Sequence, residues 1–221
     1  MAYYLFHIFG LVVAVVYMLC QLPKYEIHRP KGMLFFSFTY TTIYAVMILL
    51  HWAITGESGG QNVIRTFVFE PFIVWYYAKV FGLETDACMD LAAATSCISP
   101  AFGKLGCAIA GCCESWLQVP WGLYNEYTCT RLFPVQIAES LTAFGVGIFV
   151  HFMVKKHNYH NQGRCMPWML ILFGSTRVIW EFFRANEKIF LCFSELAIWS
   201  IAAVFLGTLW LVIDTLRKTK E

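Results

Sequence analysis

The sequence predicts an all-α, polytopic membrane protein organised as a single transmembrane domain over residues 1–221. Three observations favour this fold class: an apolar composition, long apolar runs, and an uneven distribution of Lys and Arg between the connections. Of the 221 residues, 59% are hydrophobic and only 14% are charged, and the mean hydropathy is +0.60. A soluble domain usually has about a quarter charged residues, so the composition excludes an ordinary soluble domain.

Seven apolar runs account for most of the chain. Each is close to the roughly 20 residues that a helix needs to cross a bilayer, so about seven transmembrane helices are expected. The first run has neither a basic n-region nor a small-residue cleavage site, and we interpret it as a retained helix. The runs are Met1–Leu22, Met33–Ile54, Phe67–Leu83, Met89–Cys112, Val135–Val154, Met166–Phe183 and Ile189–Val212.

Positively charged residues concentrate on one side of the predicted helices. With the N-terminus outside, the inner connections and tail carry ten Lys and Arg residues and the outer connections carry three, with Arg184 near the boundary. Because cytoplasmic loops are rich in Lys and Arg, this asymmetry predicts an N-out, C-in topology. The small net charge of +2 indicates no nucleic-acid partner. The inner cations are Lys24, Arg29, Lys31, Lys79, Lys155, Lys156, Arg164, Arg217, Lys218 and Lys220, and the outer ones are Arg65, Arg131 and Lys188.

The longest predicted outer connection, from Glu114 to Phe133, is rich in aromatic residues. Aromatic side chains favour the head-group level of a membrane. We therefore expect this segment to form a small outer loop cap over an intramembrane cavity. Its aromatic, proline and glycine residues are Trp116, Pro120, Trp121, Gly122, Tyr124 and Tyr127.

Arg177, Glu181 and Arg184 lie inside one of the most apolar stretches of the chain. Their spacing places all three along one face of a helix. An ionisable residue at membrane depth costs about 2.5–3.5 kcal/mol on insertion, so such residues face a protein interior or a wet cavity and have a function. A guanidinium beside a carboxylate suits a buried site for an anionic head group.

Two further motifs bring ionisable groups into apolar runs. The first, Gly103–Glu114, contains Lys104 among small residues and cysteines. The second, Phe133–Glu139, contains Gln136 and Glu139, which share a helix face. A structural explanation stays open for each: small-residue packing with a snorkelling lysine for the first, and an ion pair of Glu139 with a nearby cation for the second.

The nine cysteines are an odd number and lie mostly within the apolar runs, which does not indicate a secreted disulfide framework. Cys107, Cys112 and Cys113 have no companion Cys-x-x-Cys pair and no nearby histidine, so no metal site is expected. A free thiol or a disulfide near the cavity is expected instead. A disulfide between Cys129 and either Cys112 or Cys113 stays open, because the outer compartment is oxidising.

The elements around Arg177 and Glu139 resemble two motifs of the prolipoprotein diacylglyceryl transferases of bacterial plasma membranes. The family's Arg-x-x-x-Glu-Phe-x-Arg element is matched in full from Arg177 to Arg184. Its His-Pro-Ser/Thr-Gln-Leu-Tyr-Glu element resembles Phe133–Glu139, where the proline, the glutamine and the glutamate are retained. Order and spacing agree from about Lys79 to Leu196. The family's seven spans, N-out and C-in, agree with the topology predicted from charge.

The family signature Gly-Arg-x-Gly-Asn-x-x-Asn-Gly-Glu resembles Gly103–Cys112 with substitutions. Lys104 stands in place of the arginine, Cys107 in place of the first asparagine and Cys112 in place of the glutamate. The family's His-Gly-Gly-Leu-x-Gly motif falls on Ile64–Phe69 and is absent there. The resemblance therefore implies the family scaffold with a changed site.

The resemblance implies a membrane transferase that moves a diacylglyceryl group from phosphatidylglycerol to a lipobox cysteine thiol and releases glycerol phosphate. The implied partners are phosphatidylglycerol, or another anionic phospholipid, and a prolipoprotein lipobox peptide. The implied location is the bacterial plasma (inner) membrane, and no cofactor is expected. The alternative is a non-catalytic or transport-type protein that binds an anionic lipid on the same scaffold.

Such a reaction needs cations that hold the phosphate and a base that takes the thiol proton. Arg177 is expected to hold the phosphate, with Lys104 as a second cation and Glu181 orienting Arg177. Glu139 is the candidate base. The predicted catalytic residues are thus Arg177, Glu181, Lys104 and Glu139, and the predicted substrate-binding residues are Arg184, Gln136, Cys107 and Cys112.

Overall fold

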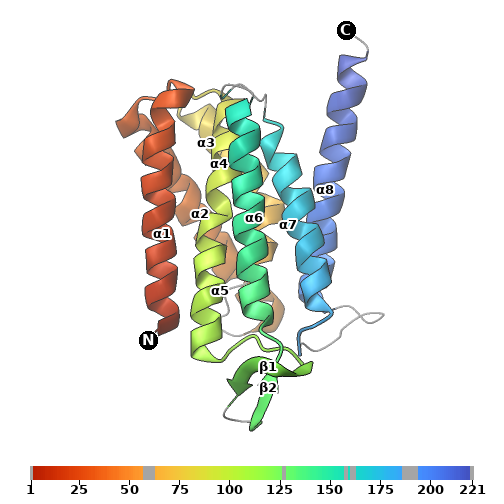
Figure 1. Cartoon of the computed structure of the whole chain (residues 1–221). Helices are drawn as coiled ribbons and strands as arrows, with labels where there is room; N and C mark the ends of the chain where they lie inside the picture. The colour runs from red at the N-terminus through yellow and green to blue at the C-terminus, as the bar shows by residue number, and fades with distance from the viewer. Residues whose placement is uncertain are drawn as a thin grey trace.

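Helices that run side by side make up most of the described chain (Figure 1). The computed structural model describes residues 2–56, 63–125, 128–156, 159, 163–185 and 194–219. A two-stranded sheet marks one end of the bundle, here called the hairpin end; α1 begins at this end, and α8 finishes at the opposite end (Figure 1). The helices are α1 (Ala2–Gln21), η1 (Leu22–Tyr25), α2 (Arg29–Thr55), α3 (Val63–Val80), α4 (Thr85–Ser96), α5 (Ile98–Ala110), α6 (Val135–Lys156), α7 (Cys165–Glu181) and α8 (Glu195–Lys218).

In the part of the chain that the structure describes, most residues of the predicted apolar runs lie on helices. By length and composition, four helical segments in the described part of the chain can cross a membrane. The chain is therefore mostly helical with membrane-type helices, while seven crossings and the N-out, C-in orientation stay predictions. The four segments are Tyr3–Tyr25, Arg29–Ile54, Val135–Lys156 and Glu195–Lys218.

The run expected as one span at Met89–Cys112 is instead two helices, α4 and α5, which meet at Cys97. Pro100 in the first turn of α5 has no backbone N–H, so it cannot donate to the Ser96 carbonyl as a continuous helix requires. α4 is buried from Ala87 to Ser96 and contacts α1, α3, α6 and α7. It is thus the centre of the bundle.

Small residues let α7 and α8 approach closely. A Cβ atom on Gly174 would lie 2.8 Å from the Ser200 carbonyl oxygen, and one on Gly207 would lie 2.7 Å from the Pro167 carbonyl oxygen. Neither position has room for a larger residue. This close packing fixes α7, and with it Arg177, against the N-terminal half of α8.

Large apolar side chains cover the outside of the bundle. Phe205 on α8 is 68% exposed and Leu141 on α6 is 66% exposed, and similar residues line α1 and α2. Soluble monomers rarely expose contiguous apolar surface on this scale. The exterior is therefore suited to lipid.

The segment expected as an outer loop cap contains a small antiparallel sheet, so the all-α prediction holds for the bundle but not for this segment. β1 (Gln118–Asn125) pairs with β2 (Thr130–Leu132), with Tyr124 opposite Arg131. Of the aromatic residues named for this cap, Tyr127 lies outside the described residues.

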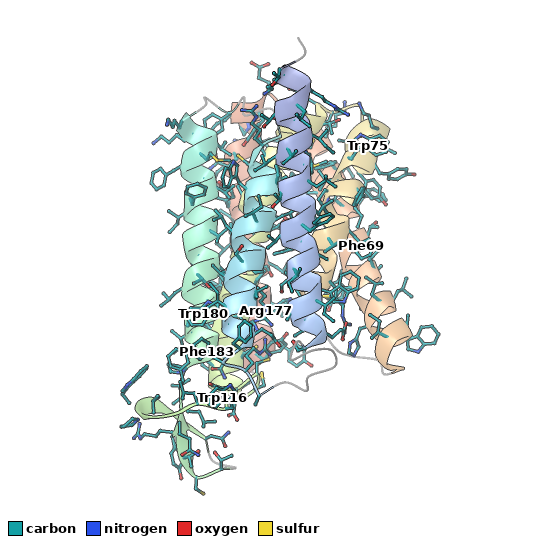
Figure 2. All side chains as sticks on the ribbon, turned by 90° about the vertical axis from the view of Figure 1, so that its right-hand side faces the viewer. Phe69, Trp75, Trp116, Arg177, Trp180 and Phe183 are labelled. Atoms are coloured by element: carbon teal, nitrogen blue, oxygen red, sulfur yellow. The ribbon has the colours of Figure 1, made fainter. Side chains whose placement is uncertain are left out.

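The hairpin is attached to the end of α7. Ser115 Oγ donates to the Phe183 carbonyl oxygen (2.6 Å), and Trp116 Nε1 donates to that of Phe182 (2.8 Å). Figure 2 shows Trp116, Trp180 and Phe183 gathered near Arg177 at the hairpin end. The cap therefore holds the chain just beyond α7 in place.

Candidate functional site

A cavity of about 320 Å³ opens between α1, α5, α6 and α7 at the hairpin end. Its volume lies within the range of small-molecule sites, roughly 300–1,000 Å³. Lys104 from α5, Glu139 from α6, and Arg177 and Arg184 from the α7 region all line it. Three motifs far apart in the sequence are therefore brought to one cavity, as the sequence predicted.

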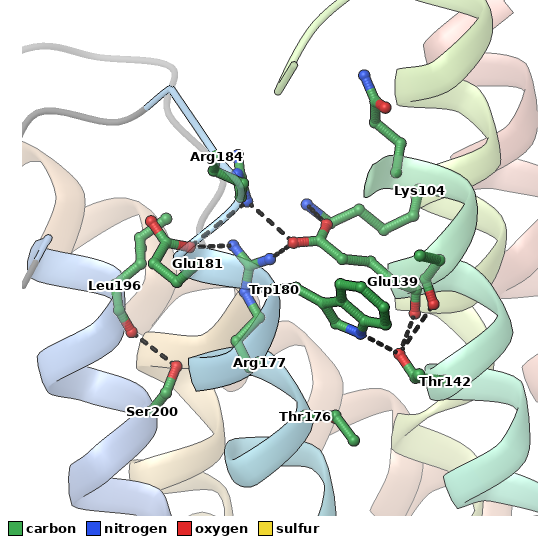
Figure 3. A network of polar contacts seen from close by, with 12 residues as sticks. Lys104, Glu139, Thr142, Thr176, Arg177, Trp180, Glu181, Arg184, Leu196 and Ser200 are labelled. Atoms are coloured by element: carbon green, nitrogen blue, oxygen red, sulfur yellow. Dashed lines mark hydrogen bonds and ion pairs between the residues drawn. The ribbon is translucent and has the colours of Figure 1, made fainter. Parts of the chain in front are cut away.

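Glu139 is the centre of a network of ion pairs, drawn in Figure 3. Its Oε2 atom lies 2.6 Å from Lys104 Nζ, and its Oε1 atom pairs with Arg177 Nη1 and lies 3.4 Å from Arg184 Nη1. Glu181 Oε2 lies 3.4 Å from Arg177 Nη2 and 4.0 Å from Arg184 Nη1. We call Lys104, Glu139, Arg177, Glu181 and Arg184 the Glu139 cluster.

The Glu139 cluster carries an excess of positive charge. Three cations and two carboxylates leave one positive charge, since 3 − 2 = 1, and all but Lys104 are buried. The buried Nε–H of Arg184 has no hydrogen-bond partner among the described residues. A buried charge is stable only when it is paired and hydrogen-bonded, so the cluster is electrostatically incomplete and suits an added anion.

Neighbouring helix ends hold the carboxylates in position. Glu181 Oε1 accepts a hydrogen bond from Ser194 Oγ (2.6 Å), and Ser194 also caps the N-terminus of α8 by accepting from the Ala197 N–H (3.2 Å). The positive end of that helix dipole favours a carboxylate there. On α6, Pro134 precedes the first helical residue and places Glu139 in the second turn.

Arg184 reaches the cluster by a route that differs from the prediction. We expected Arg177, Glu181 and Arg184 on one helix, but α7 ends at Glu181. Arg184 follows in a turn, where it forms an isolated β-bridge with Ser115 of the cap segment. The backbone of Arg184 pairs with the cap, so α7 does not continue to this residue. The Arg184 guanidinium nevertheless lies close to Glu139.

Six of the eight predicted site residues line the cavity, and two do not. Lys104, Cys107, Cys112, Glu139, Arg177 and Arg184 line it. Glu181 does not occur among the described lining residues, although it pairs with both Arg177 and Arg184. Gln136 does not occur there either: its Nε2 atom donates to the Cys112 carbonyl oxygen (2.8 Å). Gln136 therefore supports the backbone, and the roles of all eight stay predictions.

His7 of α1 lines the cavity and was not singled out from the sequence. Its Nδ1 atom is buried and has no hydrogen-bond partner in the described part of the chain. A Cβ atom on Gly103 would lie 3.1 Å from this nitrogen, so Gly103 makes room for the ring. The signal that could have found it is a histidine inside the first apolar run, because ionisable residues at membrane depth are usually functional.

The cysteines at the end of α5 form no disulfide within the part of the chain that the structure describes. Cys107 is buried, Cys113 is half-buried and Cys112 is exposed. A hydrogen bond from the Cys107 thiol, together with the cations Lys104, Arg184 and Arg177, lowers the pKa of Cys113 despite its burial. Among these three cysteines, Cys113 therefore has the thiol that loses its proton most readily.

A second cavity of about 350 Å³ adjoins the first, because His7 and Pro100 line both. Its other walls are mostly apolar, with residues from α1, α2 and α3. Glu70, which accepts a hydrogen bond from Ser96, is its acidic residue among those described. A polar cavity thus adjoins an apolar one.

Long apolar helices and a cavity lined by charged residues define this chain as a membrane protein with a polar cavity inside its helix bundle. The sequence pattern that defines the prolipoprotein diacylglyceryl transferase family matches residues 1–213, so the chain belongs to this family.

Individual relatives carry the corresponding name. The chain is 27% identical over 121 residues to the phosphatidylglycerol–prolipoprotein diacylglyceryl transferase of Clostridium tetani, covering 52% of this chain and 48% of that protein. It is 24% identical over 147 residues to the protein of that name from Leptospira interrogans, covering 63% and 46%. The chain spans about half the length of these curated relatives.

Proposed function

We propose that this protein transfers the diacylglyceryl group of phosphatidylglycerol to the cysteine thiol of a prolipoprotein lipobox and releases glycerol phosphate. One observation carries the proposal: the Glu139 cluster places an excess positive charge in a cavity between membrane-type helices. The names of the relatives support the same donor and acceptor. Because those relatives are bacterial, we place the protein in a bacterial plasma membrane with several spans.

In the proposed reaction, the carbon–oxygen bond between the diacylglyceryl group and the phosphate breaks, and a sulfur–carbon bond forms. Negative charge develops on the departing phosphate, so fixed cations beside it lower the barrier. Arg177 holds the phosphate through its planar fork, and Arg184 adds the Nε–H that has no acceptor in the described structure. Lys104 supplies a third, more mobile charge. Glu139 and Glu181 orient the two arginines.

The thiol proton needs an acceptor. Both oxygens of Glu139 are already engaged by cations, which makes this carboxylate a poor choice. We assign the role to His7, which lines the cavity and whose Nδ1 has no hydrogen-bond partner among the described residues. Ile64, which lies where the family's histidine motif falls, lines the same cavity, so His7 can replace the missing imidazole from another helix.

The adjoining apolar cavity supports the proposal by offering space for an acyl chain. Its lining includes Leu11, Met47 and Phe67, and it begins at His7. With the head group at the Glu139 cluster, the reacting carbon of the lipid would lie between the cations and this apolar space.

The experiment combines purified protein, phosphatidylglycerol vesicles and a lipobox peptide. Glycerol phosphate release and a matching mass gain on the peptide are expected, and a peptide with serine in place of the lipobox cysteine is the control. His7→Gln is expected to lower the transfer rate by roughly 10²-fold or more, as loss of a general base does, with lipid binding retained. Absence of both products with folded protein would overturn the enzymatic proposal.

The alternative is a protein that binds an anionic lipid without transferring it. The replacement of polar family positions by Cys107 and Cys112 and the absence of the histidine motif favour this alternative. It predicts saturable phosphatidylglycerol binding that depends on Arg177, with no glycerol phosphate released. The same assay therefore separates the two functions.

A further inference from the structure

The thiols of Cys107, Cys112 and Cys113 converge at the end of α5, although the chain must turn back on itself to bring them together. Gly111 adopts a left-handed conformation (φ 66°) at the C-cap, and its N–H donates to the Cys107 carbonyl oxygen. The N–H of Cys112 donates to the same oxygen (3.1 Å). This turn places the two residues that follow the helix beside its last turn.

The three sulfur atoms all lie within 4.8 Å of one another. Two thiolates on one tetrahedral zinc ion stand about 3.8 Å apart, given a Zn–S distance of about 2.3 Å. Each sulfur therefore needs to move by no more than about 1 Å to share one ion. We propose that Cys107, Cys112 and Cys113 form a three-thiolate site for a soft, closed-shell metal ion such as Zn²⁺ or Cu⁺.

The donor set decides the class of ion. Thiolates select Cu⁺ and Zn²⁺, whereas Mg²⁺ and Ca²⁺ need oxygen ligands. Three protein ligands also leave one position of a tetrahedral ion for a further ligand. Binding releases the thiol protons to solvent, and Lys104 and Arg184 along the same wall balance the negative charge that three thiolates leave on the complex.

The site is held from a second helix. Gln136 of α6 donates from Nε2 to the Cys112 carbonyl oxygen (2.8 Å), and Gln136 is buried. The turn that carries Cys112 and Cys113 is thereby fixed against α6 before any ion arrives. A ligand set held in advance loses little entropy on binding.

The sequence argued against a metal because it contains no paired Cys-x-x-Cys motifs and no nearby histidine. The turn at Gly111 answers this objection, since it brings residue 107 next to residues 112 and 113. The proposal is independent of the transfer reaction, although the sulfurs share the cavity with Lys104. An ion there occupies space near the proposed head-group site, so it is expected to weaken phosphatidylglycerol binding.

Cadmium titration of the reduced full-length protein, with metal content measured after gel filtration, tests the site. One equivalent of Cd²⁺ with a thiolate-to-metal absorbance band is expected. Each of Cys107→Ser, Cys112→Ser and Cys113→Ser is expected to weaken binding at least tenfold. Cys20→Ser, at an exposed position on α1, is the matched control and is expected to leave the affinity unchanged.

Three outcomes overturn the proposal. In the first, the reduced protein binds no Cd²⁺ at all. In the second, Cys107→Ser, Cys112→Ser and Cys113→Ser each bind Cd²⁺ as tightly as the parent. In the third, Cys20→Ser loses as much affinity as they do. Counting the free thiols before reduction distinguishes a metal site from a disulfide. A disulfide within the group of three, together with no Cd²⁺ uptake after reduction, would identify a redox pair in place of the metal site. Thermal unfolding of each variant separates loss of the site from loss of the fold, and phosphatidylglycerol transfer is scored separately.

Discussion

The Arg65–Glu195 pair and the Glu139 cluster use the same chemical groups in opposite ways. Arg65 of α3 is 1% exposed and binds Glu195 of α8 through two hydrogen bonds, Nε to Oε1 (2.7 Å) and Nη2 to Oε2 (2.5 Å). Its remaining nitrogen, Nη1, lies 3.1 Å from His51 Nδ1. One cation meets one carboxylate, and the guanidinium is fully engaged.

The Glu139 cluster is unbalanced where the Arg65–Glu195 pair is balanced. Three cations share two carboxylates, and the cluster faces a cavity. A balanced pair joins two helices and has no net charge that could attract a ligand. An unbalanced cluster retains a net charge for a ligand, and this net charge lowers the stability of the fold. We therefore infer that charge balance, more than depth in the bundle, separates the structural ion pair from the functional one.

The largest effect is expected for Arg177→Lys. The change keeps the charge but replaces a planar fork by a point charge, so transfer is expected to fall by roughly 10²- to 10³-fold, as it does when one preorganised donor is removed. The transition temperature for unfolding is expected to change little. Turnover and thermal unfolding measured on the same preparation check this, and a lysine variant that works like the parent would exclude the head-group role of Arg177.

Arg65→Met is expected to act on stability and not on chemistry. The substitution leaves Glu195 without its cation. Because the Glu195 side chain is 24% exposed, the free energy of unfolding is expected to fall by about 2–3 kcal/mol, which is below the range for fully buried pairs. The double variant Arg65→Met/Glu195→Leu is expected to recover most of it. Turnover per folded molecule is expected to stay at the parent value, and a selective loss of turnover would break the comparison drawn above.

Lys104→Met is expected to have an intermediate effect. The substitution reduces the cluster to two cations and two carboxylates, which removes the excess charge while Arg177 stays in place. Phosphatidylglycerol binding is expected to weaken by about tenfold, which equals about 1.4 kcal/mol. Lys104→Arg is the control and is expected to stay near the parent. Equal binding by both variants would show that the excess charge is not what attracts the lipid.

The smallest effect is expected for Asp214→Asn at the opposite end of the bundle. Asp214 Oδ2 lies 2.8 Å from Arg164 Nε and 3.6 Å from Lys218 Nζ, with all three side chains partly exposed. Exposed pairs contribute about 0–1 kcal/mol. Turnover is expected to stay at the parent value, and the free energy of unfolding is expected to change by no more than that amount. Thermal unfolding at low and high salt checks this expectation.

Sequence patterns identified the helices well because apolar length is a local property. The boundaries of α1 and α6 agree with the predicted apolar runs within two residues, whereas α8 begins and ends six residues later than the run at Ile189–Val212. The break at Cys97 was missed although Pro100, which prevents a continuous helix there, is visible in the sequence. The early end of α7 was missed because it depends on a backbone partner from another segment. At the end of α7, the competing partner is Ser115 of the cap.

The sequence by itself determined that this chain is a helical membrane protein of the diacylglyceryl transferase family and that Lys104, Glu139 and Arg177 are its unusual residues. Composition and motif order carry that information without coordinates. Only the tertiary structure decided that Glu139 joins three cations, that His7 lines the same cavity, and that three cysteines meet at one turn. The first two depend on helix packing between distant segments, and the third depends on the geometry of the turn at Gly111. The spacing of residues along the chain specifies neither.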